Sequence, residues 1–491
     1  MANTDPQARQ TSRPFGLWSA AFLVVANMIG AGVFTTSGFS LGDLGDRQFV
    51  LLAWLIGGVI AICGAISYGQ LAQRIAESGG EYLFLSRLVH PAVGFIAGWV
   101  SLLAGFTGAI AFAAITFESY AVPEGIRPNW LQPGVVGVAT IVLFGILHST
   151  VLKMGVAAQN VVVVLKLFLL AFFIAFAFHV YPGNWEGMQF ETEPVPFSIY
   201  KFASALVWIS LSYSGFNAAV YITGEVQNPK RNVPRALLLG TLITSMLYFA
   251  LNLIFSYAAN PKSIRGVEDV AAVAAQAIGG DGLATLVRVI VSFALLSSVS
   301  SMVLAGPRVY AKMAEDGVFP KLFNTAVGSP EELPSESVSA ENKPPSETAD
   351  VSLGNETTDS NPYATPQNYS RDAKAKSSLD ARRSVPVAAI WLQVILAATV
   401  TYFSTLKSLL NYLGFTLSVS AAITVACVLW TKRADDKIGH RILFTSIATL
   451  YVAATILLAV LSAIGDPQQL VGFALTVGSG LALYYAIKSA S

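Results

Sequence analysis

The sequence carries little charge. Asp, Glu, Lys and Arg make up 12% of its 491 residues, about half the share found in an ordinary soluble protein. So few charged side chains cannot cover a soluble surface. The apolar residues, 54% of the chain, gather instead in runs of about twenty, the length that spans a hydrocarbon core about 30 Å thick. The sequence therefore predicts an all-α integral membrane protein.

Cysteine and histidine are also scarce. Cys63 and Cys427 both fall inside apolar runs, so they can form neither a disulfide framework nor a metal site. The histidines lie singly near the ends of runs, without a ligand-type partner one helical turn away. A membrane-embedded enzyme needs reactive groups in contact, such as a Ser–His pair or metal ligands. We therefore expect no enzyme, no cofactor, no metal and no nucleic-acid partner.

Twelve apolar runs are long enough to cross a membrane as helices. We place these spans at about 16–40, 49–73, 92–117, 132–150, 155–180, 201–224, 236–258, 283–305, 386–405, 409–430, 442–463 and 469–487. Most Lys and Arg residues fall on the side of the N-terminus, a bias that puts both termini in the cytoplasm. The first run is too long for a cleavable signal peptide. We expect a cell membrane, plasma or inner, with lipid around the spans.

One connection differs from the others. Residues 323–384 are rich in Ser, Pro, Glu, Asp, Asn and Thr and contain almost no apolar residues. Such a segment cannot bury enough apolar surface to fold, so we expect a disordered cytoplasmic insert. The chain then divides into a cytoplasmic tail (1–15), five spans (16–180), five further spans that contain the insert (201–430), and two added spans (442–487).

Glycine interrupts two spans at matching places. The first span contains Gly30 and Gly32, and the sixth contains Gly215. The second break lies five spans after the first, so spans 1–5 and 6–10 would be two repeats. Because five is an odd number, the second repeat would have the opposite orientation in the membrane. Secondary transporters with such repeats bind their substrate at the broken helices. The alternative is that these glycines only allow close helix packing, but their matching positions favour broken helices.

Four stretches resemble the amino acid–polyamine–organocation (APC) superfamily of transporters. They are Ile29–Phe34, Glu77–Tyr82 with Gly98-Trp99, Tyr213–Asn217 with Gly224–Pro234, and Arg308–Gly317. The resemblance implies the LeuT-type fold, two inverted five-span repeats with two extra helices, and the activity of an amino acid permease. Gln70 and Ala76 depart from the family pattern, which often has an acidic residue and a proline there.

The two breaks and the resemblance together predict the substrate site. Freed N–H groups at the first break suit a substrate carboxylate, and freed carbonyls at the second suit an ammonium. The backbone positions are Met28, Ile29, Gly30, Ala31, Gly32, Leu211, Ser212 and Ser214. Tyr213 and Phe216 are candidates for an aromatic lid over the substrate; the alternative is that their rings only pack helices together. We expect the Asn217 side chain to form a hydrogen bond with the unwound segment. Neither break contains a charged residue, which favours a neutral amino acid.

Lys166 lies near the middle of the fifth span, roughly 16 Å from either end, too far for its ammonium to reach water. An ionisable residue at this depth is a functional candidate. In several members of the superfamily, a lysine here replaces the sodium ion of sodium-coupled relatives. We expect Lys166 to couple transport to protons without sodium. The alternative is a permanent cation that ties spans 1, 5 and 8 through Gly30 carbonyls and Ser297-Ser298, whereas Arg288 is near enough to the outer end to snorkel.

The preferred function is secondary active transport of amino acids by alternating access, in symport with protons. Glu225, at the inner end of the sixth span, is a candidate gate or loop anchor. The alternatives are an exchanger or facilitator with a structural Lys166, and a transporter-like nutrient receptor that signals through the insert. Because no extracellular loop carries a cysteine for a disulfide-linked partner, we expect no obligatory protein partner.

Overall fold

The computed structural model describes residues 15–150, 156–180, 196–323, 387–430 and 438–490. Regular secondary structure in these ranges is helical, apart from one isolated bridge between Phe15 and Val226. This confirms the prediction of an all-helical protein. The predicted tail (1–15) and insert (323–384) lie outside the described residues, except for Phe15 and Phe323.

The helices follow the predicted spans closely. The first half of the chain forms α2 (Leu17–Met28), α3 (Gly32–Leu44), α4 (Arg47–Arg74), α5 (Gly80–Leu88), α6 (Pro91–Val100), the π-helix η1 (Ser101–Gly108), α7 (Ala109–Ala121), the 3-10 turn η2 (Glu124–Ile126), α8 (Val135–Thr150) and α9 (Val156–Val180). The second half forms α10 (Ile199–Ser212), the 3-10 helix η4 (Ala218–Glu225), α11 (Pro229–Tyr257), α12 (Pro261–Ile264), α13 (Val270–Glu315), the 3-10 turn η5 (Lys321–Phe323), α15 (Val387–Phe403), α16 (Leu406–Trp430), α17 (Ile438–Gly465) and α18 (Gln468–Ala490).

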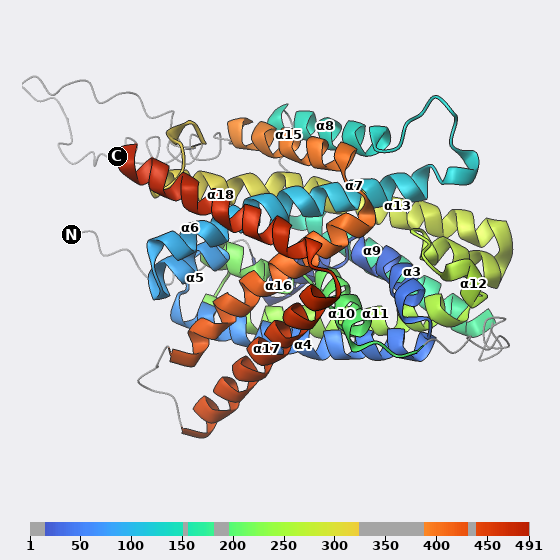
Figure 1. The fold of residues 1–491 in the computed structure, drawn as a ribbon, viewed down its shortest axis with the longest axis horizontal. Coiled ribbons are helices and arrows are strands. Elements are labelled where there is room, and N and C mark those ends of the chain that lie inside the picture. Colours follow the sequence, from blue (N-terminus) through green and yellow to red (C-terminus); the bar gives the residue numbers. More distant parts are fainter. Residues whose placement is uncertain (1–14, 151–155, 181–195, 324–386, 431–437, 491) are drawn as a thin grey trace, which may run out of the picture.

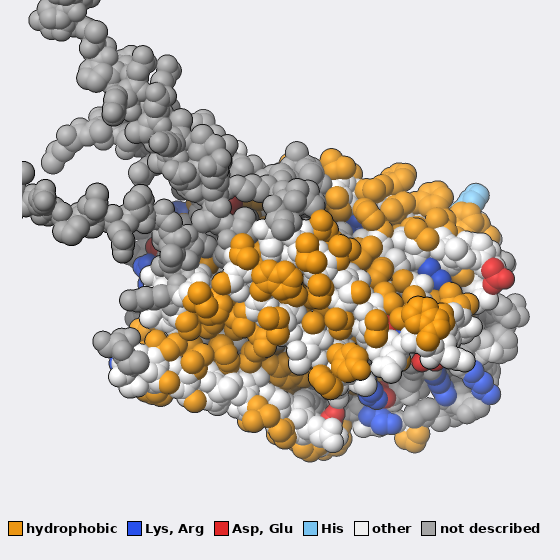
Figure 2. Space-filling view, turned by 90° about the horizontal axis from the view of Figure 1, so that it is seen from above, with side chains coloured by type: hydrophobic (Ala, Val, Ile, Leu, Met, Phe, Trp, Pro, Cys, Tyr) orange, Lys and Arg blue, Asp and Glu red, His pale blue; other side chains and the backbone are white. Residues whose placement is uncertain are grey.

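Nine segments in the described ranges are long and apolar enough to cross a membrane, and three shorter apolar helices occupy the predicted fourth, sixth and ninth spans. Large apolar side chains cover the outside of the bundle, for example Leu457 on α17 and Leu475 on α18, which are 58% and 68% exposed. The face in Figure 2 is mostly apolar, with charged side chains toward its rim. An apolar surface of this extent marks contact with lipid, and together with the membrane-length apolar helices it shows an integral membrane protein.

The two ends of the helix bundle differ. Helices α5 and α6 lie at one end, and α3 and α12 lie at the other (Figure 1). The first predicted span is divided between α2 and α3, and the sixth between α10 and η4, so the structure contains both predicted breaks. Two departures were not expected: the π-helix η1 in the third span, and a non-helical step at Gly279 and Gly280 within α13.

Candidate substrate site between two broken helices

The first break consists of residues 29–31, between α2 and α3. The N–H of Ile29 bonds to the carbonyl of Val25 at 2.9 Å, and the N–H of Gly30 bonds to the carbonyl of Met28 at 2.8 Å. These two N–H groups are therefore occupied in this conformation, in contrast to the expectation that they are free. The carbonyls of Met28 and Ile29 instead accept bonds from distant side chains, Tyr248 and Lys166.

The second break consists of residues 213–217, between α10 and η4. Gly215 has φ +97°, and a β-carbon there would lie 2.8 Å from the carbonyl carbon of Asn27. Only glycine combines this backbone conformation with so close a neighbour. The carbonyl of Leu211 accepts the N–H of Ser214 at 2.9 Å, so it too is occupied. Gly215 thus brings the second break against the end of α2, beside the first break.

Tyr248 of α11 joins the two breaks. Its hydroxyl lies 2.5 Å from the carbonyl oxygen of Met28 and 3.2 Å from that of Ser212, and the side chain is fully buried. Because a phenol has one proton to donate, the two carbonyls share it. The sequence did not indicate this residue, since a tyrosine in an apolar span is equally typical of helix packing.

Lys166 of α9 is 2% exposed. Its ammonium donates to the carbonyl of Ile29, to Ser298 Oγ at 3.2 Å and to the carbonyl of Ala294 at 3.4 Å. It therefore connects the predicted span 5 with spans 1 and 8, as expected. Ser298 is one of the two serines predicted to accept, whereas the acceptor on span 1 is the carbonyl of Ile29 rather than that of Gly30. Arg288, which we expected only to snorkel, pairs with Asp269 at 2.5 Å.

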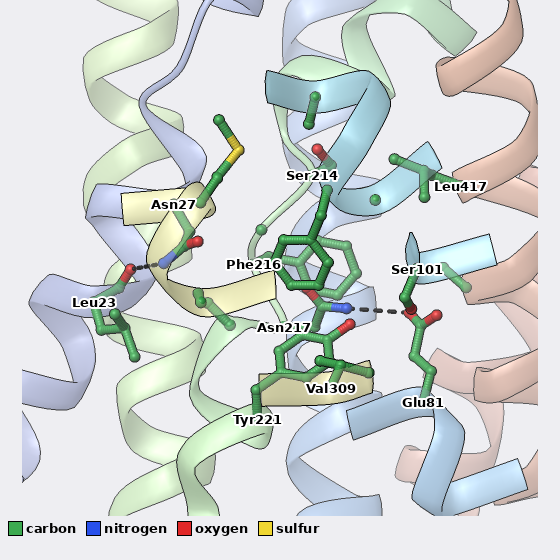
Figure 3. Close-up of a pocket in the computed structure, with 18 of the residues that line it drawn as sticks. Leu23, Asn27, Glu81, Ser101, Ser214, Phe216, Asn217, Tyr221, Val309 and Leu417 are labelled. Atoms are coloured by element: carbon green, nitrogen blue, oxygen red, sulfur yellow. Dashed lines mark hydrogen bonds between the residues drawn. The ribbon is translucent and has the colours of Figure 1, made fainter. Parts of the chain in front are cut away.

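A cavity of about 550 Å³ adjoins the second break. Of the predicted site residues it is bordered by Leu211, Tyr213, Ser214, Phe216, Asn217 and Glu225, whereas Lys166, Ser212 and residues 28–32 do not border it. The first broken span contributes Leu23 and Asn27 of α2 to its wall, neither of which was predicted from the sequence (Figure 3). The cavity continues to Glu225 and Glu315, which are exposed. It therefore reaches the surface at the end of the bundle where η4 ends.

The two candidate lid residues differ in their surroundings. The Tyr213 hydroxyl donates to the carbonyl of Trp54 at 3.1 Å, which holds this ring among α4 and α11. The Phe216 ring packs edge-on against Tyr68, with centroids 5.4 Å apart, and lies among the cavity residues (Figure 3). Phe216 is therefore the better placed of the two to cover a bound molecule.

Asn217 does not bond to the unwound segment as expected. Its amide nitrogen donates to Glu81 Oε1 at 3.1 Å, and Glu81 also borders the cavity. Glu81 was part of a motif in the sequence, but nothing there indicated that its carboxyl group is buried. Burial raises the pKa of Glu81 above its ordinary value, although the hydrogen bonds it accepts oppose that change.

Glu225, the candidate gate or anchor, has an exposed side chain. Its carbonyl accepts the N–H of Phe15 at 3.3 Å, and the N–H of Gln227 bonds to the carbonyl of Phe15 at 2.9 Å. The backbone here joins the start of the first span to the segment after η4. This arrangement has the geometry of a loop anchor that uses the backbone of Glu225.

An all-helical membrane protein with a cavity between two broken helices has the architecture of a membrane transporter. Residues 15–487 match the amino acid permease family, and the chain belongs to that family. The resemblance to the APC superfamily is thereby confirmed.

Curated relatives of this chain are amino acid transporters. The chain is 28% identical to the serine/threonine exchanger SteT of Bacillus subtilis over 312 residues, 62% of this chain and 68% of the exchanger. It is 24% identical to the mouse Asc-type amino acid transporter 1 over 320 residues, 63% of this chain and 60% of the relative. It is also 24% identical to the mouse large neutral amino acids transporter small subunit 2 over 339 residues, 66% of this chain and 63% of the relative. Less than two thirds of each mouse protein is therefore matched.

Proposed function

We propose that this protein is a secondary active transporter that moves neutral amino acids across the membrane by alternating access. The cavity is the main support, because it connects the second break with one end of the bundle. At the opposite end, the N–H of Gly266 bonds to the carbonyl of Gly38 at 2.8 Å, and the Tyr120 hydroxyl bonds to the carbonyl of Phe34 at 2.8 Å. These contacts hold α3 over the site and close it at this end. Alternating access requires such a state, in which the site is open to one side of the membrane and closed to the other.

The same proposal includes the twelve-span LeuT-type arrangement. Its support is that the breaks at 29–31 and 213–217 lie five apolar helices apart, with α17 and α18 left outside the two repeats. The proposal also includes a plasma or inner membrane as the location, and the bias of Lys and Arg supports termini on its cytoplasmic side. The cavity in this structure would then face the cytoplasm.

A neutral amino acid is the proposed cargo. No lysine or arginine of the described chain borders the cavity, so nothing there would pair with an acidic substrate side chain. Of the three acidic residues that border it, Glu225 and Glu315 are exposed at its mouth, and Glu81 already accepts hydrogen bonds. Two relatives, a serine/threonine exchanger and a subunit of a transporter of large neutral amino acids, favour the same class of cargo.

The proposed binding site is the backbone of both breaks, covered by Phe216. Since the N–H groups of Ile29 and Gly30 bond within the chain in this conformation, binding would exchange these internal bonds for bonds to the substrate carboxylate. Asn27 and Ser214 border the cavity beside them. The substrate ammonium would then lie toward the carbonyls of the second break.

Proton coupling through Lys166 is the proposed energy source, and exchange is the second candidate. Exchange is favoured by the name of the Bacillus relative, and the three acceptors around the Lys166 ammonium also suit a permanent cation. Coupling is favoured by the position of Lys166 on the first break, where gain or loss of a proton would alter the bond to Ile29.

We also propose that the chain works without an obligatory protein partner. One relative is named a small subunit, but the two cysteines of this chain are both buried, so neither is placed to form a disulfide with another protein.

Transport by purified protein in liposomes tests the proposal. We expect uptake of neutral amino acids, with little competition from acidic ones. Specific binding without any uptake or exchange would show a receptor rather than a transporter.

A further inference from the structure

Glu81 is a buried carboxyl group at the start of α5. It is 6% exposed and follows Gly79 and Gly80, whose φ angles are +146° and +59°. The ring of Tyr221, on η4, fills the space that a side chain at position 80 would need. Two glycines are therefore required to bring Glu81 against the segment that follows the second break.

Three hydrogen-bond donors from three different elements reach this carboxyl group. Tyr68 of α4 donates through its hydroxyl to Oε1, which also accepts from Asn217 Nδ2 at 3.1 Å. Ser420 of α16 donates to Oε2 at 3.2 Å. The Glu81 carboxyl group and the Asn217 side chain face each other beside the cavity in Figure 3. Glu81 thus ties the second break to α4, α5 and α16.

Cations are absent from this cluster in the described part of the chain. The titratable groups that face Glu81 are phenols: Tyr68 from α4, Tyr221 from η4 and Tyr451 from α17. On its own helix, Tyr82 bonds to Asp316 at 2.8 Å and Arg87 pairs with Glu77 at 2.9 Å. A buried carboxylate without a cation depends on its hydrogen bonds to remain ionised.

The donors distinguish the two protonation states of Glu81. An ionised carboxylate only accepts hydrogen bonds, which matches three donors, and such charge-assisted bonds are roughly twice as strong as neutral ones. When a proton binds, the hydroxyls of Tyr68 and Ser420 can rotate to accept. The amide nitrogen of Asn217 cannot accept, so its bond becomes weaker or is lost. Protonation of Glu81 therefore acts mainly on the second break.

We propose that Glu81 is a second proton-binding site of this protein, which holds the second break against α5 and α16 when ionised and releases it when protonated. The inference rests on the proposed transport function and adds to it a site separate from Lys166. Two neighbouring contacts join the same elements without titrating: the N–H of Gly224 with Ser78 Oγ at 2.9 Å, and the packing of Tyr221 on Gly80. Of these three contacts, the one through the Glu81 carboxyl group is the one that we expect to respond to pH.

The direction of the response follows from burial. Because burial raises the pKa of Glu81, the proton binds at a higher pH than it would at an exposed glutamate. The contact between the ionised Glu81 carboxylate and Asn217 of the second break is complete above that pKa and is lost as the pH falls through it. The cavity-open conformation is therefore favoured on the alkaline side, and acid on the cavity side frees the second break to move.

Infrared spectroscopy of the purified protein tests the site without any transport. Burial also raises the pKa of Glu268, so the spectrum of Glu81→Gln is subtracted from that of the wild type. We expect the difference to contain a carboxylic-acid band that grows as the pH is lowered through a value above that of ordinary glutamates. In Tyr68→Phe the titration should shift to higher pH, because the carboxylate loses a donor. Glu77→Gln is the matched control, since Glu77 is exposed and its removal should leave this band unchanged. A difference spectrum without such a band, or a band that does not shift in Tyr68→Phe, would overturn the proposal.

Exchange in proteoliposomes, with the same amino acid on both sides, tests whether protonation of Glu81 frees the second break to move. In the wild type we expect exchange to rise several-fold as the pH on the cavity side is lowered, and in Glu81→Gln to be fast at every pH. Ser78→Ala, which weakens a neighbouring contact that does not titrate, should keep the wild-type pH profile. Equal profiles for wild type and Glu81→Gln would refute the role of Glu81 and leave the transport function standing. Absence of any transport by the wild type would refute the transport function instead, while the infrared titration would still decide whether Glu81 binds the proton.

Discussion

Gly32 and Ser212 are in direct contact where the two broken spans meet. A β-carbon placed on Gly32 would lie 2.7 Å from the Cα atom of Ser212, closer than any ordinary carbon–carbon contact. The hydroxyl of Ser212 also lies 3.0 Å from that of Thr36, one turn further along α3. At Gly30, by contrast, the nearest atom to such a β-carbon is the carbonyl oxygen of Met28 at 3.9 Å. Gly32 is the glycine of close helix packing, and Gly30 has open space beside it.

The pair offers a matched test of the first break. We expect Gly32→Ala to push α3 away from α10, to cost about 1–3 kcal/mol of stability as overpacking does, and to weaken substrate binding. Gly30→Ala should have a much smaller effect, because a methyl group fits there. Thermal unfolding in detergent and a substrate-binding assay would measure both. Equal stability and affinity of the two variants would contradict this account of the contact.

Tyr248→Phe should loosen both breaks together. The variant keeps the ring but removes the donor shared by the carbonyls of Met28 and Ser212. The carbonyl of Met28 keeps the N–H of Gly30 as a donor, whereas the carbonyl of Ser212 loses the Tyr248 hydroxyl. A buried carbonyl that loses its donor costs about 1–3 kcal/mol, so we expect a lower unfolding temperature and weaker substrate binding. Tyr412→Phe is the control, since it removes a partly buried hydroxyl that bonds to Thr476 on α18, far along the chain from either break. If both variants behaved alike, Tyr248 would have no special role at the breaks.

The sequence predicted the helices better than the site. Apolar runs and glycine placement were enough to locate the apolar helices and the two helix breaks of the described residues, because helix length and backbone freedom are local properties. The partners of buried groups are set by packing between distant segments. Thus Lys166 was expected between the correct spans but with Gly30 as its acceptor, and Asn217 was expected to bond to its own unwound segment instead of to Glu81. Tyr248 was missed for the same reason.

The insert separates the transporter from the receptor hypothesis. Residues 325–380 fall outside the described part of the chain, and their composition predicts disorder on the cytoplasmic side. We expect their replacement by a short Gly/Ser linker to leave uptake within a few-fold of normal, because a disordered segment would add nothing to substrate binding. Uptake per molecule of inserted protein is the measurement. Complete loss of uptake in well-expressed protein would assign the insert a part in the transport cycle.

Lys166 decides between proton symport and exchange. Its ammonium donates to the carbonyl of Ile29 on the first span and to Ser298 on α13, so a change in its protonation acts directly on the first break. If Lys166 carries the coupled proton, uptake should rise as the external pH falls, need no sodium and collapse with an uncoupler. Lys166→Ala should then lose concentrative uptake, while exchange survives if the vacated space does not distort the first break. Lys201→Ala, at an exposed lysine of α10, is the control and should transport normally. Sodium-dependent uptake, or uncoupler-sensitive accumulation that persists in Lys166→Ala, would leave Lys166 as a structural cation. Obligatory exchange that ignores the uncoupler would make the protein an exchanger like its Bacillus relative.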